Sequence, residues 1–268
     1  MTLANGRFHM TLMFIPLIGV LLFTILPLVY MICLAFTNYD HNHLPPKSLF
    51  DWVGLANFGN VLNGRMAGTF FPVLSWTLIW AVFATVTNFL FGVILALIIN
   101  AKGLKLKKMW RTIFVITIAV PQFISLLLMR NFLNDQGPLN AFLEKIGLIS
   151  HSLPFLSDPT WAKFSIIFVN MWVGIPFTML VATGIIMNLP SEQIEAAEID
   201  GASKFQIFKS ITFPQILLIM IPSLIQQFIG NINNFNVIYL LTGGGPTNSQ
   251  FYQAGSTDLL VTLLYKLT

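Results

Sequence analysis

Residues 73–99 read VLSWTLIWAVFATVTNFLFGVILALII, a run of 27 positions without a charged side chain. Because about 20 apolar residues are enough to cross the hydrocarbon core of a bilayer, this run predicts a transmembrane helix. The composition of the whole chain agrees, since 56% of its 268 residues are hydrophobic and only 9% are charged. A soluble domain usually carries about 25% charged residues. We therefore predict an all-α, polytopic membrane protein.

A basic segment follows this run at once and predicts the orientation of the chain. It holds five of the fourteen Lys and Arg residues, namely Lys102, Lys105, Lys107, Lys108 and Arg111. Short loops rich in Lys and Arg lie on the cytoplasmic side, so we expect this loop and the N-terminus to be cytoplasmic. The same topology signal accounts for the net charge of +4 without a nucleic-acid partner.

Four further apolar runs complete the expected topology of one transmembrane domain over residues 1–268. The predicted spans are approximately residues 10–36, 73–99, 112–129, 164–187 and 215–241, with a cytoplasmic loop over 188–214. Leu259–Leu267 is only nine residues long and is too short to span. With a cytoplasmic N-terminus, five spans predict that the C-terminus lies on the external side of the membrane.

The predicted cytoplasmic loop contains EAAEIDGASKFQIFKSITFP, which runs from Glu195 to Pro214. Ser191 is expected to cap a first short helix, Gly201 to break it, and Ser203 to start a second short helix. Pro214 then marks the entry into the last span. The residues alone leave two interpretations open, a solvated connector lying on the membrane surface or a docking site for another protein.

The order of residues in this loop resembles the EAA loop of the binding-protein-dependent ABC importer permeases. Two other segments, NMWVGIPF (170–177) and NINNFNVIYLLTGGGP (231–246), resemble the maltose/maltodextrin-type permease subunits. The resemblance implies a type I ABC importer in a bacterial inner membrane. Its parts would be two different permease subunits, ATP-binding subunits inside, and an external solute-binding protein. It also implies a six-span core, of which five spans are visible and the sixth is missing, as in a truncated chain.

The resemblance assigns roles to two sets of residues. In that family the loop docks on the ATPase subunit, and the matching residues here are Glu195, Ala196, Ala197, Asp200, Gly201, Ala202 and Phe205. The positions that match the family's translocation site are Gln122, Asn170, Val173, Gly174, Phe177, Asn231 and Asn234. Two positions depart from the maltose-type pattern, because Gly230 replaces an aromatic residue and Ile118 replaces a tyrosine.

Helical spacing supports the second set independently. Asn170, Gly174 and Phe177 share one helix face, and Gln227, Asn231 and Asn234 form a similar stripe. Polar side chains are costly inside a membrane and often mark function. Amides also hydrogen-bond neighbouring helices, so a purely structural role for these asparagines stays open.

Other function classes fit the sequence less well. The chain has no GxxxxGK[ST] motif, so we expect ATP on a partner subunit, no cofactor or metal on this chain, and no enzymatic activity of its own. An ion-coupled secondary transporter is an alternative, but it needs ionisable groups within its spans, and the five runs have none. A second alternative is a non-functional permease fragment. The expected cargo is a sugar, with malto-oligosaccharides first.

Overall fold

The computed structural model describes residues 2–268 except 41, 44–48, 65 and 102, and describes no side chains before residue 11. Lys102, part of the orientation argument, lies outside the described residues. The described residues are helical apart from turns, irregular loops and two isolated bridges, Thr37 with Trp52 and Thr247 with Gly255. The predicted all-α class is thus confirmed.

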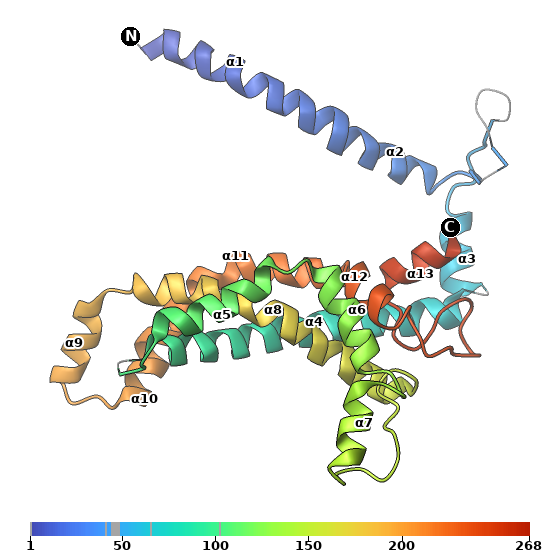
Figure 1. Cartoon of the computed structure of the whole chain (residues 1–268). Coiled ribbons are helices and arrows are strands. Elements are labelled where there is room, and N and C mark those ends of the chain that lie inside the picture. Colours follow the sequence, from blue (N-terminus) through green and yellow to red (C-terminus); the bar gives the residue numbers. More distant parts are fainter. Residues whose placement is uncertain (1, 41, 44–48, 65, 102) are drawn as a thin grey trace. The chain divides into compact units, whose positions relative to one another are not determined.

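The helices are labelled in chain order (Figure 1). Their bounds are α1 Thr2–Val20, α2 Leu26–Leu34, α3 Ala56–Asn63, α4 Ala67–Asn100, α5 Lys107–Ala119, α6 Gln122–Phe132, α7 Pro138–Lys145, α8 Pro159–Met187, α9 Ser191–Ile199, α10 Lys204–Ile207, α11 Phe213–Ile232, α12 Phe235–Leu241 and α13 Leu260–Leu267. Two π-helical turns, Leu21–Ile25 and Phe208–Thr212, connect α1 to α2 and α10 to α11.

The described chain divides into two compact units, residues 1–67 and 68–268, and each is considered by itself. In the first unit, Thr11–Leu34 is long and apolar enough to span a membrane. The amide of Asn57 on α3 donates to the carbonyls of Ala35 and Thr37 at 3.0 and 2.7 Å. These two bonds fix α3 to the end of α2. A single domain over residues 1–268 stays a prediction.

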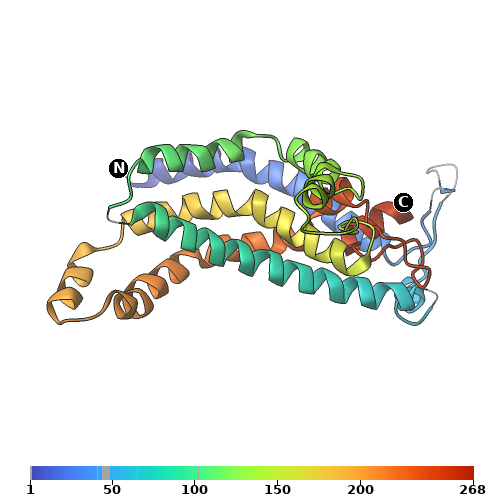
Figure 2. The same ribbon diagram turned by 60° about the horizontal axis from the view of Figure 1, so that its bottom comes forward.

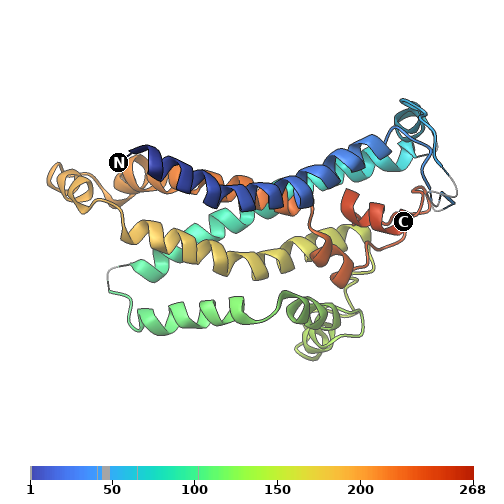
Figure 3. The same ribbon diagram turned by 90° about the horizontal axis from the view of Figure 1, so that it is seen from above.

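The second unit is built on three long helices that can each span a membrane. They are α4, α8 and the continuous helix Lys204–Ile232, which includes α10 and α11. In the second unit, α4, α8 and α11 run alongside one another, and α5 lies along α8 (Figures 2 and 3). The predicted spans 73–99 and 164–187 both lie inside these helices.

The predicted span 112–129 differs from the structure, because it is not one helix. α5 ends at Ala119, α6 begins at Gln122, and the two are bent by 92°. Val120 is extended and Pro121, which has no N–H to donate, precedes the first turn of α6. The predicted single span is therefore a pair of helices broken at Pro121.

The predicted span 215–241 is also interrupted. α11 ends at Ile232, and Asn234 caps α12 by accepting the N–H of Val237 at 3.2 Å. At its other end, α11 continues through the π-helical turn into α10. The predicted second short helix of the cytoplasmic loop is thus not separate, and Pro214 lies within the first turn of α11.

The two larger clusters of buried side chains form most of the core of the second unit. One joins α4, α6, α8 and α12 around Trp80, Leu126 and Ile166. The other joins α4, α8 and α11 around Phe89, Met179 and Ile216. α4 and α8 contribute to both clusters, so they form the frame on which α11, α12 and the broken pair are placed.

Two glycines allow α4 and α8 to approach closely. A methyl group at Gly92 would overlap the side chain of Thr178, and one at Gly174 would overlap the amide of Asn88. These contacts lie one helical turn apart on each helix and are reciprocal, since each helix supplies one glycine. Small residues at helix contacts permit this packing in membranes.

We expect Gly92→Ala to destabilise the protein by about 1–3 kcal/mol, because an extra methyl group in a packed contact forces the helices apart. Gly184→Ala on α8 is the matched control, since a Cβ there meets nothing within 4 Å. Alanine is the better helix former, so this control is neutral or slightly stabilising. Thermal unfolding of the purified protein in detergent measures both. Equal melting temperatures for the two variants would contradict the predicted close contact.

Candidate functional site

The loop over residues 188–214 folds as an elbow between α8 and α11. α9 ends in a Schellman motif: the N–H of Ala202 donates to the carbonyl of Ala197 at 2.9 Å, and that of Gly201 to Glu198 at 3.1 Å. Gly201 has a φ of +78°, which glycine adopts without strain. The predicted break at Gly201 is confirmed. Ser191 does not cap α9 as expected, because the helix begins at Ser191 itself, after the extended Pro190.

The far side of the elbow begins at Ser203 as predicted. Ser203 and Gln206 form a capping box, in which each side chain accepts the backbone N–H of the other residue. Near the membrane end, the amide of Gln215 on α11 donates to Gln193 on α9 at 2.6 Å. The elbow is therefore braced against the helix that follows it.

The surface of the elbow is open to a partner. Of the seven residues predicted there, Ala197 and Ala202 are half-buried, and the exposed ones are Glu195, Ala196, Asp200, Gly201 and Phe205. The exposed fraction is 71% for Phe205 and 86% for Ile199. Exposed apolar groups beside carboxylates are typical of a surface that docks a protein with apolar and basic groups.

A cavity of about 240 Å³ lies between α4, α6, α8 and α11. It brings together all seven residues that were predicted for the substrate path: Gln122, Asn170, Val173, Gly174, Phe177, Asn231 and Asn234. Gln227 and Gly230 complete the α11 side, and Asn88 lines the cavity from α4. Sequence reasoning missed Asn88, because no other amide residue lies near it at helical spacing. A lone asparagine in a long apolar run does not show which face of the helix lines a cavity.

Hydrogen bonds between amides connect the helices around this cavity. Asn231 donates through Nδ2 to Thr85 Oγ1 at 3.0 Å. Asn234 donates through Nδ2 to Asn231 Oδ1 and to Asn170 Oδ1, each at 3.4 Å. Asn231 and Asn234 thus combine both roles that the sequence left open, since they line the cavity and also join α4, α11, α12 and α8.

The end of α11 is held by a long-range contact. The indole N–H of Trp80 on α4 donates to the backbone carbonyl of Asn231 at 3.0 Å, and both groups are buried. A carbonyl in the last turn of a helix has no partner within the helix. The backbone N–H of Asn234 also donates to this carbonyl, at 3.2 Å, so Trp80 adds a second partner that ties the end of α11 to α4.

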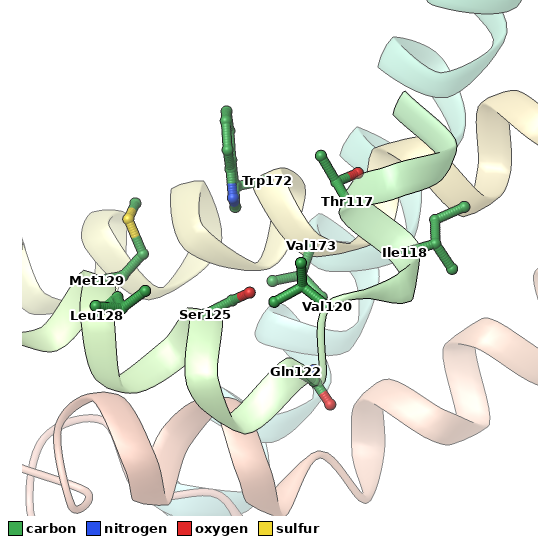
Figure 4. Close-up of a pocket in the computed structure, with 9 residues that line it drawn as sticks. All are labelled: Thr117, Ile118, Val120, Gln122, Ser125, Leu128, Met129, Trp172 and Val173. Atoms are coloured by element: carbon green, nitrogen blue, oxygen red, sulfur yellow. The ribbon is translucent and has the colours of Figure 1, made fainter. Parts of the chain in front are cut away.

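Both helix breaks lie at the cavity. Gln122 begins α6 after the first break, and Asn234 caps α12 after the second. A second hollow of about 570 Å³ adjoins the first break and shares Gln122 and Val173 with the amide-lined cavity. In Figure 4, Gln122 points away from Trp172, whereas Ser125 and Val173 lie nearer the middle of this hollow. Gln122 thus borders both spaces.

Residues 88–260 match the family of binding-protein-dependent transport system inner membrane components. The chain belongs to this family. The matched segment contains the elbow and every cavity residue named above. The family suggested by the sequence is thereby confirmed. The match also confirms the membrane-spanning fold and the prediction that the chain is a permease component and not itself an enzyme.

Individual relatives and a solved structure are also similar to this chain. The chain is 41% identical over 259 residues to the galactooligosaccharides transport system permease protein GanP of Bacillus subtilis, covering 94% of this chain and 61% of GanP. It is 41% identical over 268 residues to the maltodextrin transport system permease protein MalC of Streptococcus pneumoniae, covering 96% and 61%. The chain thus spans about three-fifths of the length of these relatives. A bacterial ABC transporter that imports the acidic polysaccharide alginate has the same fold, with a TM-score of 0.74 at 23% identity, covering 98% of this chain and 85% of that one.

We expect Thr85→Val to destabilise this protein by about 1–3 kcal/mol, because the substitution leaves the buried amide of Asn231 without its hydrogen-bond acceptor. Thr87→Val is the matched control on the same helix, since the Thr87 hydroxyl donates to the Phe83 carbonyl of its own helix at 2.7 Å. Thermal unfolding in detergent, followed by tryptophan fluorescence, measures both variants. A Thr85→Val protein as stable as the control would show that this bond does not hold α11.

Proposed function

We propose that the chain is the membrane-spanning permease subunit of an ABC importer that moves a neutral oligosaccharide into the cell. The observation that carries the proposal is the joint presence, within the family match, of an exposed elbow and an amide-lined cavity on the same two helices. The elbow joins the end of α8 to the start of α11. Those helices supply Asn170, Gly174, Phe177, Gln227 and Asn231 to the cavity.

This connection gives the elbow a mechanical role. ATP-binding subunits would dock at α9 and the Gly201 bend, and ATP would be bound and hydrolysed on them. Movement of the elbow would pull or push α8 and α11 at their cytoplasmic ends. The cavity lies on the order of 40 Å away along α11, at about 1.5 Å per residue from Lys204 to Asn231. Rigid helices would carry the displacement over that distance.

The remaining partners follow from the same proposal. A second permease subunit would close the open side of the cavity, and an external solute-binding protein would deliver the sugar. The run of basic residues that follows α4, from Lys102 to Arg111, supports a cytoplasmic position for this loop, the elbow and the N-terminus. The names of the two relatives support malto-oligosaccharides and galacto-oligosaccharides as candidate cargo.

The chemistry of the cavity supports a neutral sugar. Its ten lining residues are amides, glycines, a valine and a phenylalanine, and none carries a charge. Amides donate and accept hydrogen bonds with hydroxyl groups, and the exposed ring of Phe177 can lie against the apolar face of a sugar. A buried carboxylate without a cation would cost several kcal/mol, which disfavours uronic acids.

The importer assembled with its partner subunits in proteoliposomes tests this function. We expect ATP-dependent uptake of radiolabelled maltotriose or galactotriose, competed by the unlabelled sugar. An excess of a trimeric uronate is expected to leave that uptake unchanged. Competition by the uronate would contradict the neutral-sugar assignment. Uptake of neither neutral sugar would contradict the proposed cargo.

Gly201→Val tests the elbow. Valine is strained at a φ of +78°, so the bend would change shape and transport would uncouple from ATP hydrolysis. We expect uptake to fall at least tenfold while basal ATPase activity persists, and Asp200→Lys to act in the same direction. Gly147→Val is the matched control, because Gly147 has a φ of +73° and is equally exposed but follows α7. Wild-type uptake by Gly201→Val would rule out coupling through this bend.

A further inference from the structure

Asn88 is a buried amide with an unused acceptor. Its side chain is 5% exposed, lines the amide-lined cavity, and keeps Oδ1 without a hydrogen-bond partner among the described residues. Buried polar groups in folded proteins nearly always have a partner. The unpaired oxygen therefore points to a polar group that enters the cavity from outside the chain.

The packing of α4 on α8 explains why this oxygen remains available. Gly174 lies directly against the Asn88 amide, and any side chain at position 174 would overlap it. The contact of Gly92 with Thr178, one turn further along, holds the two helices at this distance. Asn88 is thus held in place by packing rather than by a hydrogen bond to its Oδ1.

The amides of the cavity separate into two groups by their partners. Asn231 donates through Nδ2 to Thr85, and Asn234 donates through Nδ2 to Asn170 and Asn231, so these two amides hold the helices together. Asn88 Oδ1, Asn170 Nδ2 and Gln227 Nε2 have no partner among the described residues, although all three atoms are buried. They come from three different helices, α4, α8 and α11, and provide one acceptor and two donors.

We propose that Asn88 is a specificity-determining residue of the cavity, whose side-chain oxygen accepts a hydrogen bond from a hydroxyl group of the transported saccharide. The proposal rests on the proposed function. Asn170 and Gln227 supply the complementary donors to hydroxyl or ring oxygens. A neutral polyhydroxylated ligand matches this set, because each hydroxyl group both donates and accepts. A site built to bond a hydroxyl group rejects ligands that place it elsewhere, so Asn88 discriminates between sugars that differ in hydroxyl orientation.

The test compares Asn88→Leu and Asn88→Ser with the wild type in the complete importer in proteoliposomes. The probes are radiolabelled maltotriose and galactotriose, supplied with the external binding protein. We expect Asn88→Leu to lower the kcat/KM of uptake at least tenfold while ATPase activity stimulated by the binding protein stays within twofold. We expect Asn88→Ser, which keeps a shorter acceptor, to change the ratio of the two uptake rates at least fivefold.

Asn233→Leu is the matched control, since Asn233 is exposed and its amide donates to the Ile229 carbonyl of its own helix at 3.1 Å. It is expected to transport both sugars as the wild type does. A purely structural role for Asn88 would lower uptake, ATPase activity and melting temperature together and leave the sugar ratio unchanged, and that result would overturn the proposal.

Two further outcomes distinguish this proposal from the function on which it rests. If the wild type imports sugar and both Asn88 variants do so with unchanged kinetics and ratio, the Asn88 assignment is wrong and the proposed function stands. If the wild type imports neither probe, the proposed cargo is wrong and the assignment of Asn88 fails with it.

Discussion

A helix that ends within a membrane releases backbone carbonyls that need partners from elsewhere in the chain, and the architecture around the cavity depends on the contacts that hold one such helix end. α11 ends at Ile232, and the carbonyl of Asn231 accepts the indole N–H of Trp80 at 3.0 Å. Thr85, on the same helix as Trp80, accepts the side chain of Asn231 at 3.0 Å. α4 thus stabilises the end of α11, and Asn234 caps the next helix, α12.

The same constraint explains why polar residues gather where they do. A broken helix needs polar side chains nearby, and such side chains can also contact a ligand. The break between α5 and α6 presents Gln122, and the break between α11 and α12 presents Asn234, on the cavity that Asn170 reaches from an unbroken α8. Amide atoms that hold the helices together therefore lie next to amide atoms that are available to a ligand. Whether an atom has a hydrogen-bond partner within the chain distinguishes the two roles.

Local signals predicted the elbow and the face of α8, but not the breaks or Asn88. Gly201 and Ser203 act on their own neighbours in the chain, and Asn170, Gly174 and Phe177 repeat at helical spacing. Proline was a poor guide, since α8 continues through Pro176 and α11 through Pro222. The break after Ile232 contains neither proline nor glycine. The end of α11 is instead held by the bond between Trp80 and Asn231, which are 151 positions apart. Nothing in a local window reports such a contact.

The lengths of the hydrogen bonds indicate where the cavity can open. N–H···O bonds in proteins usually measure about 2.7–3.2 Å. The two bonds that tie Asn231 to α4 are 3.0 Å each, whereas Asn234 reaches both Asn170 and Asn231 only at 3.4 Å. The hydrogen bond from Asn234 to α8 is therefore weaker than the hydrogen bonds from Asn231 to α4, although α12 also packs on α8 through buried apolar side chains. In the proposed cycle, an elbow that separates the ends of α8 and α11 would break the bond between Asn170 and Asn234 first. That step frees Asn170 Oδ1 beside its already unpaired Nδ2, so the whole amide faces the ligand as the path widens.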